Sequence, residues 1–267
     1  MGKTMRQLLS FECEGEVLAA TLDDAPRSSG LLIVSGGNEI RIGAHRGMAA
    51  LAAEISAIGH PVFRFDRRGV GDSTGENREF TSNGPDIAAA ITAFFAACPH
   101  LKRIVAFGNC DAASALVLRP PEGLDRLILA NPWVIERSDE MPAPAAIRAR
   151  YTERVRDPKA WAGLFTGGTS LKKLASGLLR IATPRPPSGL ASSVAQGIAA
   201  FPGPVQILLA TRDGTAITFA SEWGKPGFAA ARAKPNLSVT RLDSASHSFA
   251  NAEDNAVLRA TLLSALA

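Results

Sequence analysis

The chain has 267 residues, 46% of them hydrophobic, so it can bury a sizeable core as one α/β domain with a modest insertion. Its net charge of +4 comes from 29 basic and 25 acidic residues that are scattered without a run of one sign, which argues against a nucleic-acid partner. Three cysteines without paired spacing predict neither a disulfide framework nor a zinc site, and with no signal peptide or membrane span in the sequence we expect a cytoplasmic protein.

The first predicted elements are two strands of a β-ribbon, at about 8–11 and 17–22, joined by a turn at Glu14-Gly15. Beyond them, short apolar runs alternate with helical periodicity, which is typical of a parallel sheet covered by helices on both faces. The expected strands are 31–34, 62–65, 104–107, 127–129, 205–209 and 237–242, and the expected helices are 44–58, 85–97, 111–118 and 252–266. The sequence therefore predicts an α/β fold with a mostly parallel sheet of about eight strands.

The regular alternation stops between residues 136 and 200, where Pro, Ala, Arg and Gly are frequent. Because a structureless loop of this length is rare in a compact domain, we predict a helical cap over 136–200. Residues 1–135 and 201–267 would then form the core. The cap's Trp161, Phe165 and arginines would suit either an acyl chain or an anionic group, and the sequence does not decide between them.

A sharp strand-turn-helix is predicted at Gly108-Asn109-Cys110-Asp111-Ala112, the context required of a nucleophile elbow. The nucleophile's backbone is strained in such a turn, so the residues two positions away must be small, as Gly108 and Ala112 are. A thiol at a helix N-terminus beside an imidazole can react as a thiolate at neutral pH. The alternative interpretation is a buried, inert cysteine next to a helix cap.

Four histidines are available as the base that such a nucleophile needs. His247 follows the last predicted strand, which places it at the carboxyl edge of the sheet, where ligands bind in such folds. His60 and His100 precede strands, and we expect both to face solvent. Asp213, in the loop after strand 205–209, is the preferred acid to orient the imidazole, with Asp243 as its rival; a turn cap is the structural alternative for Asp213.

The glycine-rich loop Ser35-Gly36-Gly37-Asn38 directly follows the strand 31–34. We predict an oxyanion hole formed by the backbone N–H groups of Gly37 and Asp111, with Asn38 as the alternative to Gly37; the glycines could also serve only a turn. Asn38, His45 and Arg46 are candidate substrate contacts, although packing at a helix N-terminus is an equal alternative for the last two.

Together with Asp66-Arg67-Arg68-Gly69-Val70-Gly71-Asp72-Ser73, which we expect to support the loops rather than to catalyse, these motifs resemble those of the α/β-hydrolase superfamily. The order nucleophile, acid, histidine is also that of the superfamily. More narrowly, residues 36–46, Phe63-Arg64-Phe65-Asp66 and the cysteine elbow are similar to the type-one hydrolases of bacterial exosortase A systems, which export and sort surface proteins and exopolysaccharide. Ala112 stands where a glycine is usual, and Ser35 where a histidine commonly precedes the oxyanion glycines.

The residues and the resemblance predict an esterase or thioesterase in which Cys110 attacks the carbonyl, His247 transfers the proton and Asp213 fixes the imidazole. This chemistry needs no metal or organic cofactor. The expected partner is a small acyl substrate, and the oligomeric state is not specified by the sequence. Acyl transfer to an acceptor other than water and a non-catalytic binding protein of the same fold are the alternatives.

Overall fold

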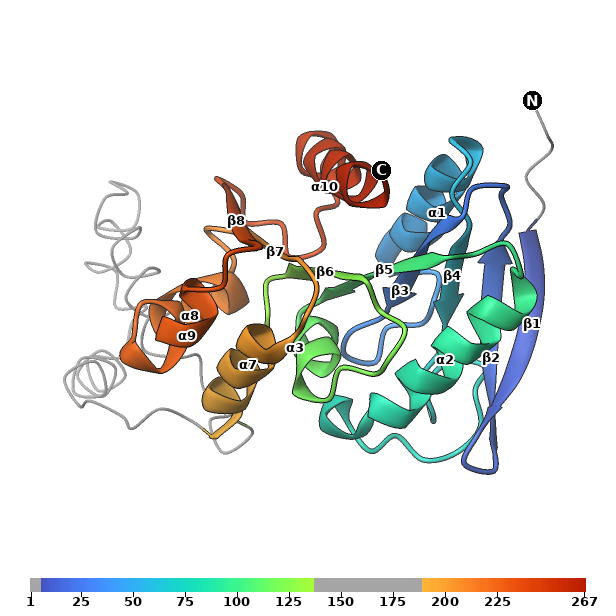
Figure 1. Ribbon diagram of the computed structural model, residues 1–267, viewed down its shortest axis with the longest axis horizontal. Coiled ribbons are helices and arrows are strands. Elements are labelled where there is room, and N and C mark those ends of the chain that lie inside the picture. Colours follow the sequence, from blue (N-terminus) through green and yellow to red (C-terminus); the bar gives the residue numbers. More distant parts are fainter. Residues whose placement is uncertain (1–5, 137–188) are drawn as a thin grey trace, which may run out of the picture.

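The computed structural model describes residues 6–136 and 189–267, which contain one eight-stranded sheet (Figure 1). The strand order is β1-β2-β4-β3-β5-β6-β7-β8. Strand β2 pairs antiparallel with β1 and β4, and every other pair is parallel. The strands are β1 (Arg6–Cys13), β2 (Glu16–Asp23), β3 (Ser29–Val34), β4 (Val62–Phe65), β5 (Arg103–Asn109), β6 (Arg126–Ala130), β7 (Val205–Ala210) and β8 (Leu237–Leu242). The predicted fold class is confirmed.

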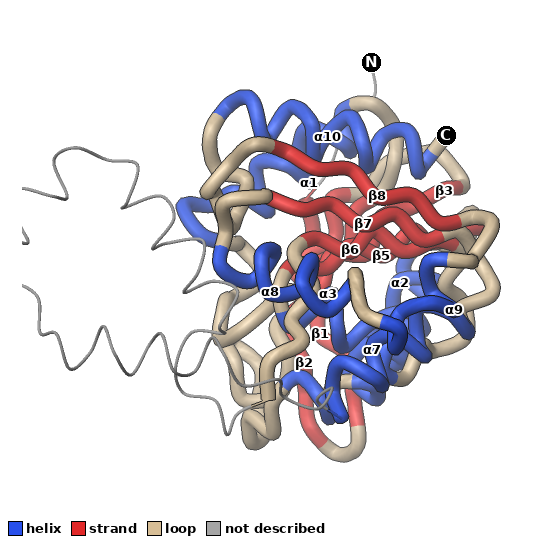
Figure 2. The backbone as a smooth tube through the Cα atoms, turned by 90° about the vertical axis from the view of Figure 1, so that its left-hand side faces the viewer, coloured by secondary structure: helices blue, strands red, loops and turns tan. Residues whose placement is uncertain are grey.

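Helices cover both faces of the sheet (Figure 2). Helices α1 (Gly47–Ala57) and α10 (Ala252–Leu266) lie on one face. The other face carries α2 (Gly84–Ala97), α3 (Asp111–Leu118), α7 (Gly189–Ala200), α8 (Gly214–Trp223) and α9 (Ala229–Arg232). Short 3-10 turns lie at η1 (Ala44–Arg46), η2 (Phe80–Ser82) and η3 (Pro226–Phe228). The four predicted helices are present within a few residues of their expected bounds, whereas α8 and α9 were not predicted and α7 lies in the segment predicted as the cap.

Strand β5 shows why short apolar runs form this sheet. Its side chains alternate between the two faces, so Ile104 and Ala106 join the core under α2 and α3, while Val105 and Phe107 join the core under α1 and α10. A strand buried on both faces needs an apolar residue at every position. Because β3 to β8 run parallel, their carboxyl ends share one edge of the sheet, and the loops that leave this edge carry the predicted site residues.

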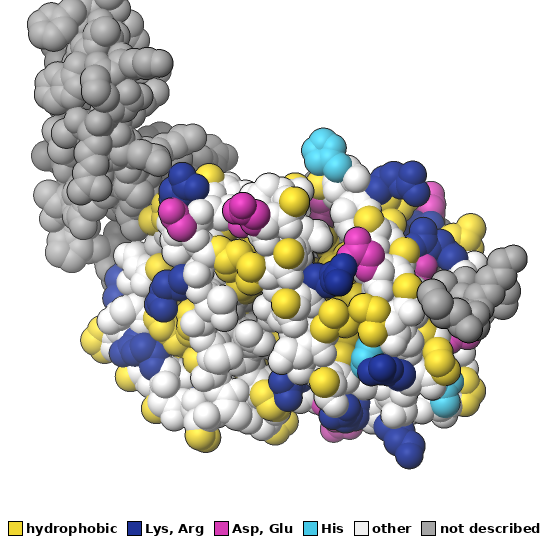
Figure 3. All heavy atoms as spheres, turned by 90° about the horizontal axis from the view of Figure 1, so that it is seen from above, with side chains coloured by type: hydrophobic (Ala, Val, Ile, Leu, Met, Phe, Trp, Pro, Cys, Tyr) yellow, Lys and Arg dark blue, Asp and Glu magenta, His cyan; other side chains and the backbone are white. Residues whose placement is uncertain are grey.

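Most of the predicted cap, residues 137–188, lies outside the described residues, so the division into core and cap stays a prediction. The end of the cap segment forms α7, which packs against α3 and α9. No helix within 6–136 and 189–267 is long and apolar enough to cross a membrane. On the face drawn in Figure 3, Lys and Arg side chains are dispersed among acidic ones, as expected from the scattered charge.

Candidate active site

Cys110 occupies the tight turn between β5 and α3, with backbone angles φ 60° and ψ −125°. Such a conformation is strained for a residue with a side chain and is typical of nucleophile turns. Its N–H donates to the Ala130 carbonyl at 2.9 Å, and its own carbonyl accepts from Trp133 N–H at 3.1 Å. Gly108 is required here, because a Cβ at that position would lie 2.8 Å from the Ala112 backbone. The turn is therefore held in place by strand β6 and by close packing.

His247 and Asp213 meet at this edge, with 2.9 Å between His247 Nδ1 and an Asp213 carboxylate oxygen. The other carboxylate oxygen accepts the N–H groups of Thr215 and Ala216, so Asp213 also caps α8. Burial alone would raise the pKa of Asp213, but the hydrogen bonds from His247 and from the two amides lower it below its ordinary value. Asp213 is thus held as a carboxylate that orients the imidazole.

The imidazole of His247 interacts with both proposed partners. Its hydrogen bond to Asp213 and, second, its interaction with the Cys110 thiol raise the pKa of His247 to about 10, against the opposing effect of burial. The structure therefore brings Cys110, His247 and Asp213 together. Asp243 does not take part: its side chain is 88% exposed and pairs with Arg212 at 3.0 Å.

Two asparagines that were not predicted as site residues fix the histidine loop to the elbow. Asn109 and Asn131 both donate side-chain N–H groups to the His247 carbonyl, at 3.0 and 3.2 Å. Asn131 is buried, and its side-chain oxygen accepts the Ala210 N–H at 2.9 Å. Their positions in the sequence could have indicated this role, because Asn109 belongs to the elbow and Asn131 directly follows β6 at the same edge of the sheet.

The two predicted oxyanion donors differ in their surroundings. We find no acceptor for the N–H of Asp111 among the described residues, as expected at the start of a helix. The N–H of Gly37, a residue with φ 56°, donates instead to the Asp111 carboxylate at 2.6 Å. Gly37 can therefore serve an oxyanion only if the Asp111 side chain turns away.

The three candidate substrate contacts differ in whether they line the cavities that contain Cys110. Asn38 lines both of the cavities that contain Cys110, and its side-chain oxygen accepts from Asn77 at 2.8 Å. His45 lines only the smaller cavity, and Arg46 lines neither. Both residues are exposed and adopt positive φ angles at the entrance to α1.

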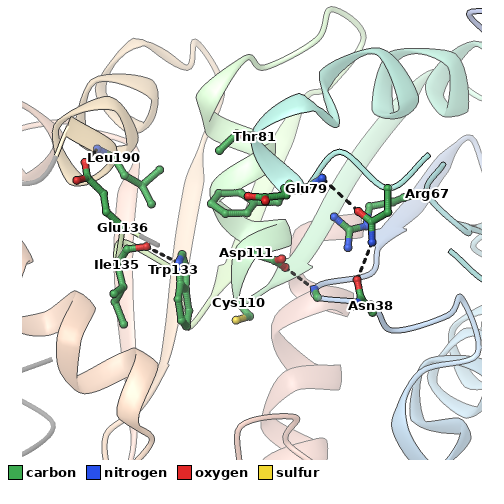
Figure 4. A pocket seen from close by; sticks show the side chains of 13 residues that line it. Asn38, Arg67, Glu79, Thr81, Cys110, Asp111, Trp133, Ile135, Glu136 and Leu190 are labelled. Carbon is green, nitrogen blue, oxygen red and sulfur yellow. Dashed lines mark hydrogen bonds between the residues drawn. The ribbon is translucent and has the colours of Figure 1, made fainter. Parts of the chain in front are cut away.

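Cys110 lies between two cavities. The larger measures about 730 Å³ and is lined by Trp133, Phe80, Asp111 and Arg67 among others (Figure 4). The smaller measures about 390 Å³ and contains the histidine side of the site; its lining includes His247, His45, Met48 and Phe249. No group of three or more His, Cys, Asp or Glu side chains in the described part of the chain could hold a metal ion.

The segment after β4 has the supporting role that we expected, with one exception. Asp66 is buried and accepts the N–H groups of Arg41 and Asp72, at 2.6 and 3.1 Å. Arg68 pairs with Asp86 at 2.5 Å. Arg67, between them, lines the larger cavity, a position that sequence reasoning did not distinguish from its neighbours.

The expectation for His60 is wrong. His60 is buried, because it lies directly before a central strand and under the loop before β3. One ring nitrogen is 2.8 Å from the Ser29 carbonyl and the other is 3.2 Å from Arg27. His100 is exposed, as predicted.

Comparisons with known proteins agree with the fold. Residues 31–261 match the family described as "Alpha/beta hydrolase family". Curated proteins gave no match to this chain. Among solved structures, the Pyrococcus furiosus esterase Pf2001 is 15% identical with a TM-score of 0.67, covering 99% of this chain and 94% of its own. A proline iminopeptidase-related protein from Thermus thermophilus is 15% identical with a TM-score of 0.60, covering 98% of this chain and 99% of its own. At these identities the structural likeness concerns the fold.

Proposed function

The chain belongs to the alpha/beta hydrolase family, and we propose that it hydrolyses an ester or a thioester through Cys110, His247 and Asp213. One observation carries the proposal: the imidazole of His247 is hydrogen-bonded to a partly buried carboxylate while it interacts with a thiol on a strained turn. A nucleophile, a base and a group that orients the base are the three parts needed for covalent acyl transfer.

In the first step, His247 takes the proton of the Cys110 thiol, the thiolate sulfur attacks the acyl carbonyl carbon, and His247 passes that proton to the departing alcohol or thiol. The raised pKa of His247 suits this role, because the imidazole carries a proton at neutral pH. The product is a thioester between the acyl group and Cys110. The oxyanion formed on the way would accept the free N–H of Asp111 and, once the Asp111 carboxylate has moved, that of Gly37.

In the second step, a water molecule attacks the thioester, His247 takes its proton, and the acid leaves as Cys110 is restored. The free Cys110 side chain contributes to the raised pKa of His247, and this contribution ends when the sulfur is acylated. The histidine then becomes a better base when the reaction requires one. The same pair of residues thus serves both halves of the cycle.

Replacement of Cys110 by alanine tests the proposal. We expect kcat/KM for 4-nitrophenyl and thioester substrates to fall by about 10³-fold or more, because the covalent route is lost. Cys98→Ala is the matched control, since burial raises the pKa of the Cys98 thiol to about 12 and we expect its loss to leave the rate unchanged. Undiminished hydrolysis by Cys110→Ala would contradict the assignment.

We also propose that this hydrolysis accompanies an exosortase A system. The support is the resemblance of residues 36–46, Phe63-Arg64-Phe65-Asp66 and the cysteine elbow to the type-one hydrolases of such systems. In a bacterium that carries the system, removal of the protein should alter the export of exopolysaccharide or of sorted surface proteins. Unchanged export of both would refute this link and leave the hydrolase assignment intact.

A further inference from the structure

Arg67 is a buried cation without an anionic contact in the described part of the chain. The residue is 3% exposed, its Nε has no hydrogen-bond partner, and it forms no ion pair with a described carboxylate. When the Asn83 amide is oriented with its oxygen toward Arg67, it accepts one guanidinium N–H. Burial lowers the pKa of Arg67, and the charges of Asp111 and Asp86 oppose that effect from beyond contact distance.

The neighbouring arginines pair with carboxylates, although the Nε of Arg64, like that of Arg67, has no hydrogen-bond partner. Arg64 is equally buried and lies 3.1 Å from an Asp23 oxygen, while Arg68 contacts both Asp86 and Glu14 at 2.5 Å. Buried charges are normally paired in this way, because an unpaired charge in a protein interior is strongly destabilising. Arg67 therefore has the environment of a binding group whose anionic partner comes from outside the protein.

The cavity beside Arg67 leads to the nucleophile. Arg67 and Cys110 line the same cavity of about 730 Å³, and Figure 4 shows Asp111 lying between them. In the resting protein, the described acidic side chains that line it already have partners: Asp111 accepts from Gly37, Glu136 accepts from the Leu190 N–H at 3.1 Å, and Glu79 is also engaged. Among the described residues, Arg67 is the positively charged group of this lining, and its planar fork matches an anionic oxygen group.

Each of the two cavities would hold one end of the substrate. The leaving group receives its proton from His247, so it belongs in the smaller cavity, which His247 lines. The acyl portion then extends from Cys110 into the larger cavity, toward Arg67. Trp133 and Phe80 provide an apolar wall along that path.

We propose that Arg67 binds an anionic oxygen group, a carboxylate or a phosphate, at the far end of the acyl portion of the substrate. The inference rests on the proposed hydrolase function and narrows its substrates to esters or thioesters of acids that carry a second anionic group. Arg67 is then a residue that determines specificity, and it takes no part in bond making or breaking.

The first experiment uses the wild-type protein with two matched substrates. We expect kcat/KM for the 4-nitrophenyl half-ester of adipic acid to exceed that for its neutral methyl ester by about 10-fold or more, as for a charged hydrogen-bonded contact. The difference should appear mainly in KM. An equal or higher kcat/KM for the neutral ester would overturn the proposal.

Variants then test whether Arg67 causes the preference for the anionic substrate. Arg67→Met should remove it, and Arg67→Lys should restore part of it, because lysine keeps the charge without the fork. Arg78→Met is the control: Arg78 carries the same charge in the loop before η2, is 68% exposed and does not line the cavity. A preference that survives in Arg67→Met, or that disappears equally in Arg78→Met, would contradict the assignment; thermal melting confirms that each variant is folded.

A binding measurement separates this proposal from the proposed function. Adipate and inorganic phosphate are tested for protection of Cys110 against iodoacetamide, with neutral adipamide as the control. Protection by either anion in the wild type and not in Arg67→Met supports the anion site even if no ester is hydrolysed. Protection by adipate alone identifies a carboxylate site and protection by phosphate alone a phosphate site; protection by neither, or equal protection by adipamide, overturns it.

Discussion

The histidines at the two edges of the sheet have opposite surroundings and opposite pKa shifts. At the amino edge, both ring nitrogens of His60 have partners, the Ser29 carbonyl and Arg27, and burial lowers the pKa of His60. At the carboxyl edge, one ring nitrogen of His247 is bonded to Asp213, and this hydrogen bond, together with the interaction with Cys110, raises the pKa of His247. A polar group whose hydrogen bonds are all made within the protein stabilises the fold, whereas a polar group that faces a cavity is available for chemistry.

Backbone strain follows the same division. Seven non-glycine residues in the described part have positive φ angles. Six of them lie in loops that leave the carboxyl ends of β3, β4, β5, β6 and β8: His45, Arg46, Glu79, Cys110, Asn131 and Phe249. Strained residues persist only where the surrounding structure holds them. Their concentration at one edge agrees with a site that is built there at some expense to stability.

Matched histidine variants test this comparison most severely. His247→Ala should lower kcat/KM by about 10²- to 10⁴-fold, the range for loss of a general acid-base group. His60→Ala should keep the activity and lower the free energy of unfolding by about 1–3 kcal/mol, because the Ser29 carbonyl loses its buried partner. Ester hydrolysis and urea denaturation of both variants measure the two effects.

The comparison would fail if the two variants behaved alike. Equal losses of activity would mean that His60 acts on the site through the sheet. Arg27→Ala offers an intermediate case at the amino edge, since it removes only one of the two partners of His60.

Most of the fold was predictable because its signals are local. A strand buried on both faces requires an apolar run, and the alternation of such runs with helices indicates the sheet. Helix α8 was missed because its sequence carries the β-branched residues Thr215, Ile217 and Thr218, which have low helix propensity. Its start is set by the side chain of Asp213, which accepts two of its N–H groups.

The site was predictable only as far as topology reaches. Each predicted residue follows a parallel strand, so their meeting at one edge could be expected; the bond from Gly37 to the Asp111 carboxylate depends on a side-chain rotamer and could not. The same limit applies to His60: its position before a strand indicates at which edge of the sheet it lies, but not whether its side chain is buried. Arg64, Arg67 and Arg68 are alike in sequence, and only the three-dimensional placement of carboxylates distinguishes Arg67.

The smallest expected effect concerns the titration of His247. Asp213→Asn removes the charge of the largest contributor to its raised pKa, so the pKa of His247 should fall from about 10 toward its ordinary value of 6.5. The asparagine oxygen can still accept the Thr215 and Ala216 N–H groups, so α8 should remain capped and the variant folded. We expect kcat/KM to fall by about 10²-fold, because the imidazole is less well oriented.

The sign of the pH dependence follows from the same shift. A folded-state pKa above the unfolded value means that His247 contributes stability that is complete below pH 6.5 and is lost as the pH rises through about 10. In Asp213→Asn this loss between pH 6.5 and 10 should shrink. Proton NMR titration of the histidine ring signals measures it directly, with His60 as the internal reference because its partners are untouched. A His247 signal that titrates unchanged in Asp213→Asn would show that Asp213 does not control the charge of the imidazole, and the assignment of opposite roles to the two edges would lose its electrostatic basis.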